Sequence, residues 1–159
     1  MSESSTAGAL ASVGAKLLGV RWLMRVPIAL YRVRLGFLLG GRFLLLEHRG
    51  RVSGRPRRVV LEVIGRPAPD SYLVVSGFGT KAQWYRNVRA TPRVGVTVGV
   101  HRPRPAQAHI LDRDEAASAL TAYAKAHPRA WASFGPILDT TLGAPAHTVP
   151  VVRFDLLPR

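Results

Sequence analysis

The sequence predicts an α+β fold built around an antiparallel β-barrel, with helices at the start, in the middle and late in the chain. Short apolar runs of strand length are separated by turn residues, and residues 94–100 (VGVTVGV) repeat with period two, as in a strand. Helical patterns do not follow every strand. The order of the elements therefore favours a barrel over a parallel βαβ array.

A chain of 159 residues is the size of one domain, large enough to bury about 70% of the surface of its unfolded form. We expect a single domain over residues 1–159. Within it, residues 1–8 are small and polar and should be disordered, residues 9–41 should hold the N-terminal helices, and residues 42–157 should form the barrel.

Six strands and two later helices are expected along the barrel region. The strands are residues 43–48, 58–64, 72–76, 94–100, 104–111 and 148–157. The turn-rich sequence GRPAPD, residues 65–70, should connect the second strand to the third. One helix is expected over residues 82–90. Another should begin at Asp112, because Glu115 three residues later completes a capping box, and should end near His127.

The N-terminal third is apolar and basic, with helical patterns at residues 9–35 and 28–39 and a helix-breaking Pro27. Such a segment is typical either of a helix that packs on its own domain or of one that lies at a membrane surface. No signal peptide is recognisable, and arginines interrupt every apolar run before the length of about 18 residues that spans a membrane. We therefore expect a cytoplasmic protein, with possible peripheral contact at the inner face of the membrane through residues 9–35.

The net charge of +14 comes from twenty arginines and three lysines against nine acidic residues, and it favours anionic partners. No cysteine is present, which excludes disulfides and thiolate metal sites. The five histidines show no metal-ligand spacing, so no metal site is expected. Glu47 and Glu62 lie in apolar strands, where pairing with arginines is expected of them in preference to acid catalysis.

Much of the positive charge lies in one loop, HRGRVSGRPRR, between the first two expected strands. Gly50 and Gly54 permit a tight turn, and Ser53 with neighbouring backbone N–H groups could line a small concavity for an anion. Arg51 and Arg57 could then pair with phosphate oxygens. The alternative is a solvated basic hairpin loop with no ligand.

A second stretch, VVSGFGTKAQWYRN, places a glycine-rich turn between a strand and a helix. Ser76 ends the strand, and Lys81 lies near the start of the helix, where anionic groups are favoured. Trp84 and Tyr85 could form a flat wall for an aromatic ligand or could anchor the core. The spacing alone leaves both alternatives open.

Three motifs in this order, GRVSGRPR, SGFG and WYRNVRATPRVGV, resemble the deazaflavin (coenzyme F420)-dependent nitroreductase family over residues 37–156. The resemblance implies a split antiparallel β-barrel of about six strands, with an N-terminal helical segment, flanking helices and a cofactor groove. By position, it assigns the cofactor phosphate to the first motif and the deazaflavin ring to the other two. The implied cofactor-binding residues are Gly50, Arg51, Ser53, Gly54, Arg55, Arg57, Arg58, Ser76, Gly77, Phe78, Gly79, Lys81, Trp84, Tyr85 and Asn87.

The sequence departs from this family in two places. Val52 stands where many relatives have lysine, which removes one expected phosphate contact that Arg55 or Arg58 could replace. Relatives carry tyrosines near the substrate in the late helical region, where this chain reads AHPRAWASFG. The proton donor therefore does not transfer by position, and Tyr85 and His127 are the candidates by residue type.

The resemblance implies an oxidoreductase in which reduced F420 gives a hydride to a small electrophilic acceptor such as a quinone, a nitroaromatic or an activated enone. One alternative is a split-barrel oxidoreductase that binds FMN, because the same arginines would suit a flavin phosphate. Another is a non-enzymatic basic module for nucleic acid or anionic membrane. Nucleic acid is disfavoured as a partner, because aromatic residues are few and the charge is concentrated in one loop.

Overall fold

The computed structural model describes residues 41–99, 101–142, 145 and 148–159. The predicted helices within residues 9–39, the predicted disorder of residues 1–8 and the predicted membrane contact of residues 9–35 lie outside this part of the chain. We describe the barrel and the helices around it.

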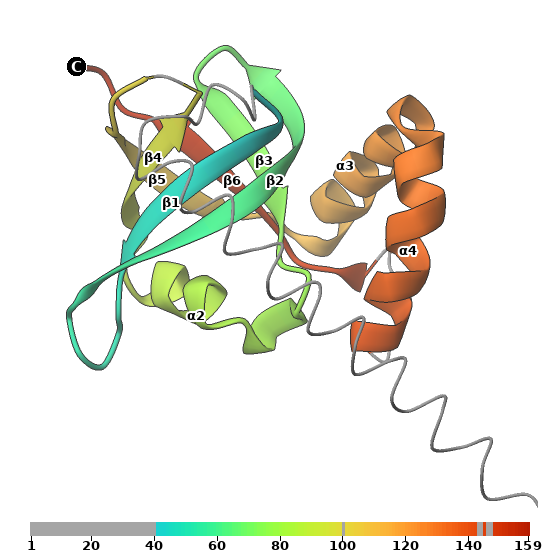
Figure 1. Ribbon diagram of the computed structural model, residues 1–159, viewed down its shortest axis with the longest axis horizontal. Helices are drawn as coiled ribbons and strands as arrows, with labels where there is room; N and C mark the ends of the chain where they lie inside the picture. The colour runs from blue at the N-terminus through green and yellow to red at the C-terminus, as the bar shows by residue number, and fades with distance from the viewer. Residues whose placement is uncertain (1–40, 100, 143–144, 146–147) are drawn as a thin grey trace, which may run out of the picture.

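Six antiparallel strands close into a barrel in the order β1-β2-β3-β6-β5-β4 (Figure 1). The strands are β1 (Phe43–Arg49), β2 (Pro56–Ala68), β3 (Ser71–Val75), β4 (Arg93–Val98), β5 (Arg104–Ile110) and β6 (Val151–Leu156). Side chains alternate between the inside and the outside of a strand, so one face of each strand fills the barrel. Leu44, Leu46, Val74, Val96 and Phe154 belong to that interior and are almost completely buried.

One end of the barrel is closed by α2 (Gln83–Ala90), which lies across it below the strands in Figure 1. Trp84, Tyr85 and Val88 of this helix belong to the same hydrophobic cluster as the barrel interior. A short 3-10 helix, η2 (Gly79–Lys81), joins β3 to α2. The helix and the barrel core are therefore one packed unit.

A second core forms on the outside of the barrel, where α3 (Arg113–Ala126) covers β2, β3 and β6. Leu120 and Tyr123 of α3 pack with Ile64, Val75 and Val151. The helix begins with the predicted capping box: Asp112 accepts from the Glu115 backbone N–H, and the Glu115 carboxylate accepts from the Asp112 N–H. Then α4 (Pro128–Leu142) runs beside α3 on the same flank of the barrel (Figure 1).

The predicted α+β barrel of about six strands is confirmed. The last strand begins at Val151 and not at residue 148, and two larger local expectations change. β2 continues through the predicted turn at residues 65–70 as far as Ala68, because register shifts on either side of Gly65 absorb the turn-forming residues. No separate helix was predicted at α4, since Pro128 and Pro136 are helix breakers by type. Pro128 instead occupies the first helical position, where its missing N–H leaves no unpaired hydrogen bond.

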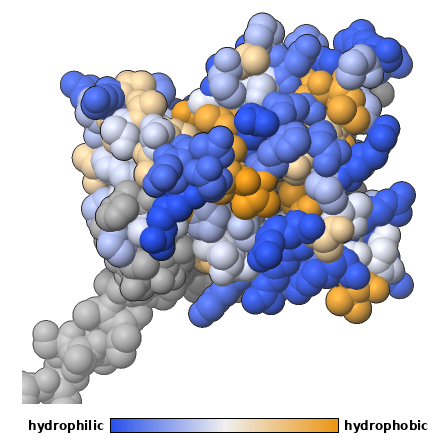
Figure 2. Space-filling view, turned by 180° about the vertical axis from the view of Figure 1, so that it is seen from behind, coloured by the Kyte–Doolittle hydropathy of each residue, from blue (hydrophilic) through white to orange (hydrophobic). Residues whose placement is uncertain are grey.

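On the face in Figure 2 most of the coloured surface is hydrophilic, and the hydrophobic residues form patches among the hydrophilic ones. Val52 and Phe78 are the most exposed of its large hydrophobic residues, at 93% and 59%. Among the residues that the structure describes, no helix is both long enough and apolar enough to cross a membrane.

Candidate functional site

The arginine-rich loop between β1 and β2 is a compact turn closed by its own backbone. The Gly50 N–H donates to the Arg55 carbonyl at 2.9 Å, and the Gly54 N–H donates to the Gly50 carbonyl at 2.8 Å. Gly54 has a φ of +68°, which favours glycine, and Ser53 Oγ accepts from the Arg55 N–H at 3.2 Å. The two glycines are thus needed for this conformation, as predicted.

Two polar side-chain atoms converge on the space beside Gly50. A Cβ atom built on this glycine would lie 2.6 Å from Ser53 Oγ and 3.2 Å from Arg57 Nε. A hydroxyl and a guanidinium directed at one small volume are the donors that a phosphate oxygen accepts from. Gly50 therefore allows a hydroxyl and a guanidinium, both able to donate to an anion, to lie close together, and we call this group the cradle.

The same loop is tied to α2, the helix of the WYRN motif. Asn87 Oδ1 accepts from the Arg51 backbone N–H at 3.1 Å and from Arg51 Nη1 at 2.9 Å. Arg51 Nη1 also donates to Gln83 Oε1 at 2.9 Å. Residues 36 positions apart in sequence are thereby brought together, and part of the Arg51 guanidinium is engaged in holding the loop.

Behind Asn87 lies His48, a residue of β1. The Asn87 amide nitrogen is 3.2 Å from His48 Nδ1, and both side chains are buried. Burial, with a smaller contribution from the Arg57 guanidinium, lowers the pKa of the His48 imidazole below its ordinary value of 6.5. The imidazole is therefore part of the support of the loop.

The glycine-rich turn after β3 is closed in a similar way. Ser76 Oγ donates to the Gly79 carbonyl at 2.6 Å, and the Gly79 N–H donates to the Ser76 carbonyl at 2.9 Å. Ser76 is completely buried and Gly79 has a φ of +64°, while Phe78 projects from the turn. Of this motif, Phe78 is the large side chain available at the surface, and Lys81 is also exposed.

The sequence left open whether Trp84 and Tyr85 form a wall or anchor the core. Both are buried, at 9% and 4% exposure, within the barrel cluster, and their rings meet edge to face at 6.0 Å. Their contacts are those of core anchors. Neither residue lines either of the two cavities described next.

A basic groove of about 820 Å³ runs along the ends of β1, β2 and β4. Its charged wall consists of Arg49, Arg57, Arg58 and Arg93, with Glu47 as the one acidic residue. Arg58 Nε pairs with Glu47 at 2.7 Å, as expected for an acid in an apolar strand. Within the described chain no carboxylate pairs with Arg57 or Arg93, so the groove keeps a net positive charge.

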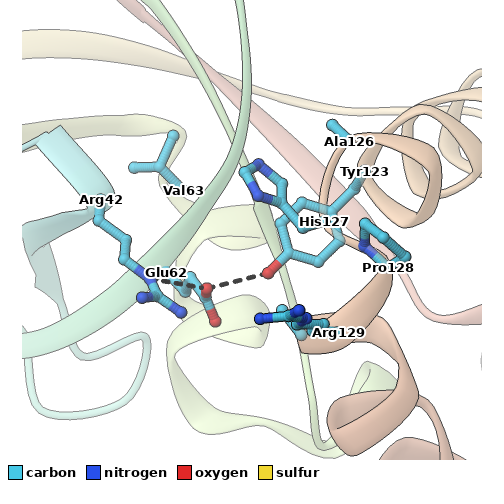
Figure 3. A pocket seen from close by; sticks show the side chains of 9 residues that line it. Arg42, Glu62, Val63, Tyr123, Ala126, His127, Pro128 and Arg129 are labelled. Carbon is cyan, nitrogen blue, oxygen red and sulfur yellow. Dashed lines mark hydrogen bonds and ion pairs between the residues drawn. The ribbon is translucent and has the colours of Figure 1, made fainter.

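A second cavity, of about 510 Å³, lies between β2 and the junction of α3 with α4 (Figure 3). The predicted donor His127 lines it, together with Glu62, Tyr123, Arg42 and Arg129. Figure 3 shows the Glu62 carboxylate between Arg42 and Tyr123. It accepts from the Tyr123 hydroxyl at 3.0 Å and from Arg42 Nε at 3.4 Å.

Tyr123 is held as a neutral donor in this cavity. Burial, and next the negative charge of Glu62, raises the pKa of the Tyr123 hydroxyl to about 12. The His127 ring lies against the Tyr123 ring with centroids 4.9 Å apart. A phenol with so high a pKa is a weak acid, and its role is therefore to hold Glu62.

Both regions lie along one strand, β2. Arg57 and Glu62 are five residues apart on it, or about 17 Å at roughly 3.4 Å per residue. Sequence patterns indicated the loop but not the Tyr123 and Arg42 partners of Glu62, which come from distant parts of the chain. For this cavity, the sequence offered one indication: Glu62 is an acid in an apolar strand, which predicted an ion pair with an arginine but did not identify that arginine.

A family model for F420H(2)-dependent quinone reductases matches residues 23–142, three quarters of the chain. The chain belongs to this family. It is an oxidoreductase that uses coenzyme F420, and the resemblance seen in its three motifs is confirmed. The family match favours F420 over FMN as the cofactor.

Solved structures with the same fold include an F420-H2 dependent reductase, FDR-A, at 25% identity and a TM-score of 0.52. That match covers 72% of this chain and 94% of the other. A putative pyridoxamine 5'-phosphate oxidase from Listeria innocua has 10% identity, a TM-score of 0.51 and coverage of 80% and 92%. A putative 5-nitroimidazole antibiotic resistance protein from Bacteroides thetaiotaomicron has 12% identity, a TM-score of 0.51 and coverage of 80% of both chains. The last two show the fold alone. A search of curated protein sequences gave no match.

Proposed function

We propose that this F420-dependent reductase holds the phosphate of its cofactor in the loop of residues 50–55 and reduces a neutral electrophilic acceptor, with quinones as the first class to test. The observation that carries the proposal is the convergence of Ser53 Oγ and Arg57 Nε on the space beside Gly50. Arg51 and Gly54 support that cradle by fixing the loop. Arg55 is exposed at its edge and supplies further positive charge.

The deazaflavin end of the cofactor would contact the turn of Ser76 to Gly79. Phe78 offers an exposed aromatic face there, and Gly77 leaves room for a flat ring to approach the backbone. Trp84 and Tyr85 would stabilise this turn from the core side. Lys81 would add a positive charge beside it.

The basic groove is suited to the acidic tail of the cofactor. F420 carries an oligoglutamate chain, and Arg49, Arg57 and Arg93 present guanidinium groups that no carboxylate of the described chain neutralises. Charged complementarity of this kind accelerates association and fixes orientation. Arg58 contributes less, because Glu47 already pairs with it.

Bound F420 supplies hydride chemistry, while the chain supplies orientation, electrostatics and exclusion of water. We place the acceptor in the cavity of Figure 3, where His127 would donate the proton that the oxygen of a reduced acceptor takes up. His127 is exposed and can exchange protons with solvent. Of the two predicted donors, Tyr85 is the weaker candidate, since it is buried in the barrel core.

The decisive experiment is a fluorescence titration of the purified protein with oxidised F420, with FMN titrated in parallel. We expect saturable micromolar binding of F420 and weaker binding of FMN. A quinone, a nitroaromatic and an enone should then be compared as acceptors with reduced F420. The absence of saturable F420 binding would overturn the proposed site.

The membrane contact remains a proposal from the sequence of residues 9–35 alone. Basic residues among apolar ones in this segment would attract an anionic bilayer, where lipophilic quinones are found. The test is sedimentation with anionic vesicles of the full chain and of a variant that lacks residues 1–35. Loss of sedimentation in the shorter variant supports the proposal, whereas equal sedimentation contradicts it.

A further inference from the structure

The contacts of Asn87 fix which way its amide faces. Its oxygen accepts two N–H groups of Arg51, from the backbone at 3.1 Å and from Nη1 at 2.9 Å. Its nitrogen therefore faces the other way, toward His48 Nδ1 at 3.2 Å. Because an amide NH₂ can only donate, His48 Nδ1 has to accept, which requires a neutral imidazole with its proton on Nε2.

We propose that neutral His48 is a positioning residue for the cofactor: acting through Asn87, it holds Arg51 and the loop of residues 50–55 in the form that binds phosphate. The inference rests on the proposed cofactor site. It assigns a role to a buried side chain that lines the basic groove but acts on the loop through Asn87. The hydrogen bonds between His48 and Asn87 and between Asn87 and Arg51 link the barrel interior to the surface loop.

Protonation of His48 would break this series of hydrogen bonds. An imidazolium donates from both nitrogens, so Nδ1–H would oppose the Asn87 NH₂ group. The amide would have to rotate and would then turn its own NH₂ toward the two Arg51 donors. Arg51 would lose both hydrogen bonds to Asn87, and of its side-chain links to α2 it would keep the one to Gln83.

The surroundings of His48 keep it neutral near pH 7. Arg57 on β2 faces the imidazole and opposes a second positive charge, as does burial. The groove beside His48 adds other charged groups, namely Glu47, Arg49, Arg58 and Arg93. Glu47 is the one carboxylate among them, and Arg58 already pairs with it. The pKa of His48 is therefore lowered from 6.5, and its charged form appears only in acid.

Two substitutions separate this role from simple packing. His48→Phe keeps a buried ring but removes the acceptor for Asn87. Asn87→Asp keeps oxygen acceptors for Arg51 and replaces the NH₂ with an oxygen that accepts from a protonated His48. His109→Phe is the control, because His109 is half exposed and pairs with Asp155 on the β5–β6 side of the barrel.

The first measurement is the dissociation constant of F420 from about pH 8 down to about pH 5. Wild type and His109→Phe should bind well above pH 7 and lose affinity in acid. His48→Phe should bind about tenfold more weakly at pH 8, the effect of one buried hydrogen bond, and lack that acid loss. Asn87→Asp should also keep its affinity in acid, since its carboxylate accepts both from protonated His48 and from Arg51. Titration of F420 itself is common to all four proteins and cancels in the comparison.

The second measurement needs no cofactor. In nitrogen-detected NMR spectra of the free protein, His48 should carry its proton on Nε2, and the Arg51 amide signal should shift as His48 titrates. His48→Phe should abolish the pH-dependent shift of Arg51. If the Arg51 amide signal shifts with the titration of His48 but the protein does not bind F420, the proposed cofactor site is wrong and the His48–Asn87–Arg51 link is right. An Arg51 amide that ignores the His48 titration, or equal pH profiles in wild type and His48→Phe, would overturn the inference.

Discussion

Two regions along β2 are built on different principles: the loop that precedes the strand, which we call the loop end, and the cavity beside its middle residue Glu62, which we call the cavity end. At the loop end, Arg51, Asn87 and His48 form a hydrogen-bonded chain that runs from the surface into the barrel core. At the cavity end, Glu62 lies on the barrel's outer face and is held by Tyr123, which comes from 61 residues later in the sequence. The loop is therefore supported from the buried barrel core, whereas the cavity depends on how α3 docks.

This difference suggests how one fold keeps a cofactor while its acceptor changes. A site held from the core tolerates little change, because each substitution disturbs barrel packing as well. A cavity whose walls are the barrel on one side and two helices on the other can be altered by substitution of the helix residues alone. Residues such as His127 and Arg129 line this cavity and do not line the basic groove, so we expect their substitution to leave the proposed phosphate site intact.

The largest effect we expect is at the loop end. Arg57→Ala removes a charged donor from the cradle beside Gly50 and should weaken F420 binding by about 1.5 to 3 kcal/mol. Arg66→Ala is the matched control, because Arg66 lies on the same strand but contacts the Pro69 carbonyl and the Tyr72 ring. Fluorescence titration of both variants measures the effect. Equal affinities in the two would place the phosphate elsewhere.

The next effect belongs to the cavity end. Tyr123→Phe removes a hydrogen bond to a carboxylate, so we expect a loss of about 1.5 kcal/mol in the free energy of unfolding. Glu62 would then keep only Arg42, and the KM for the acceptor should change while the F420 dissociation constant does not. Denaturant unfolding and steady-state kinetics measure the two effects. If F420 binding fell as far as in Arg57→Ala, the two ends would not be independent.

Sequence patterns predicted the two ends unequally for a physical reason. The loop and the turn depend on local requirements, such as glycine at the positive φ of Gly54 and Gly79, which a short motif records. The Glu62 carboxylate finds Tyr123 only after α3 has packed on the barrel, and no local pattern encodes that contact. The same limit applied to His48, whose hydrogen bond to Asn87 joins residues 39 positions apart.

Secondary structure was predicted well where hydrophobic period and capping agreed, as at Asp112. It failed where a residue type had two uses. Pro128 ends helices in general but starts α4 here, and the turn residues after Gly65 are absorbed into an irregular strand. Both outcomes depend on neighbours in space, namely α3 beside α4 and Leu73 close to Gly65.

A smaller effect tests the docking of α3 as a unit. Asp112→Ala removes the capping box at the start of this helix and should lower the free energy of unfolding by about 1 kcal/mol. F420 affinity should stay the same, because α3 does not support the loop. Asp114→Ala controls for charge, since Asp114 lies in the same first turn but outside the capping box. Equal losses in both variants would assign the effect to the helix dipole and not to the cap.

The last effect is confined to alkaline solution. The folded pKa of Tyr123 is about 12 against 10.0 for an ordinary tyrosine, so between these values the unfolded chain loses a proton that the folded chain keeps. This contribution to stability is complete below pH 10 and disappears as the pH rises toward 12. Tyr123→Phe should therefore lose less stability over that range than wild type. In the folded state, phenolate absorbance of the variant should lack the one tyrosine that titrates near pH 12 in wild type. Matching pH profiles of wild type and Tyr123→Phe would mean that the Tyr123 hydroxyl is open to solvent. Tyr123 would then not fix Glu62 in the cavity of Figure 3, and the contrast between the cavity end and the loop end would be lost.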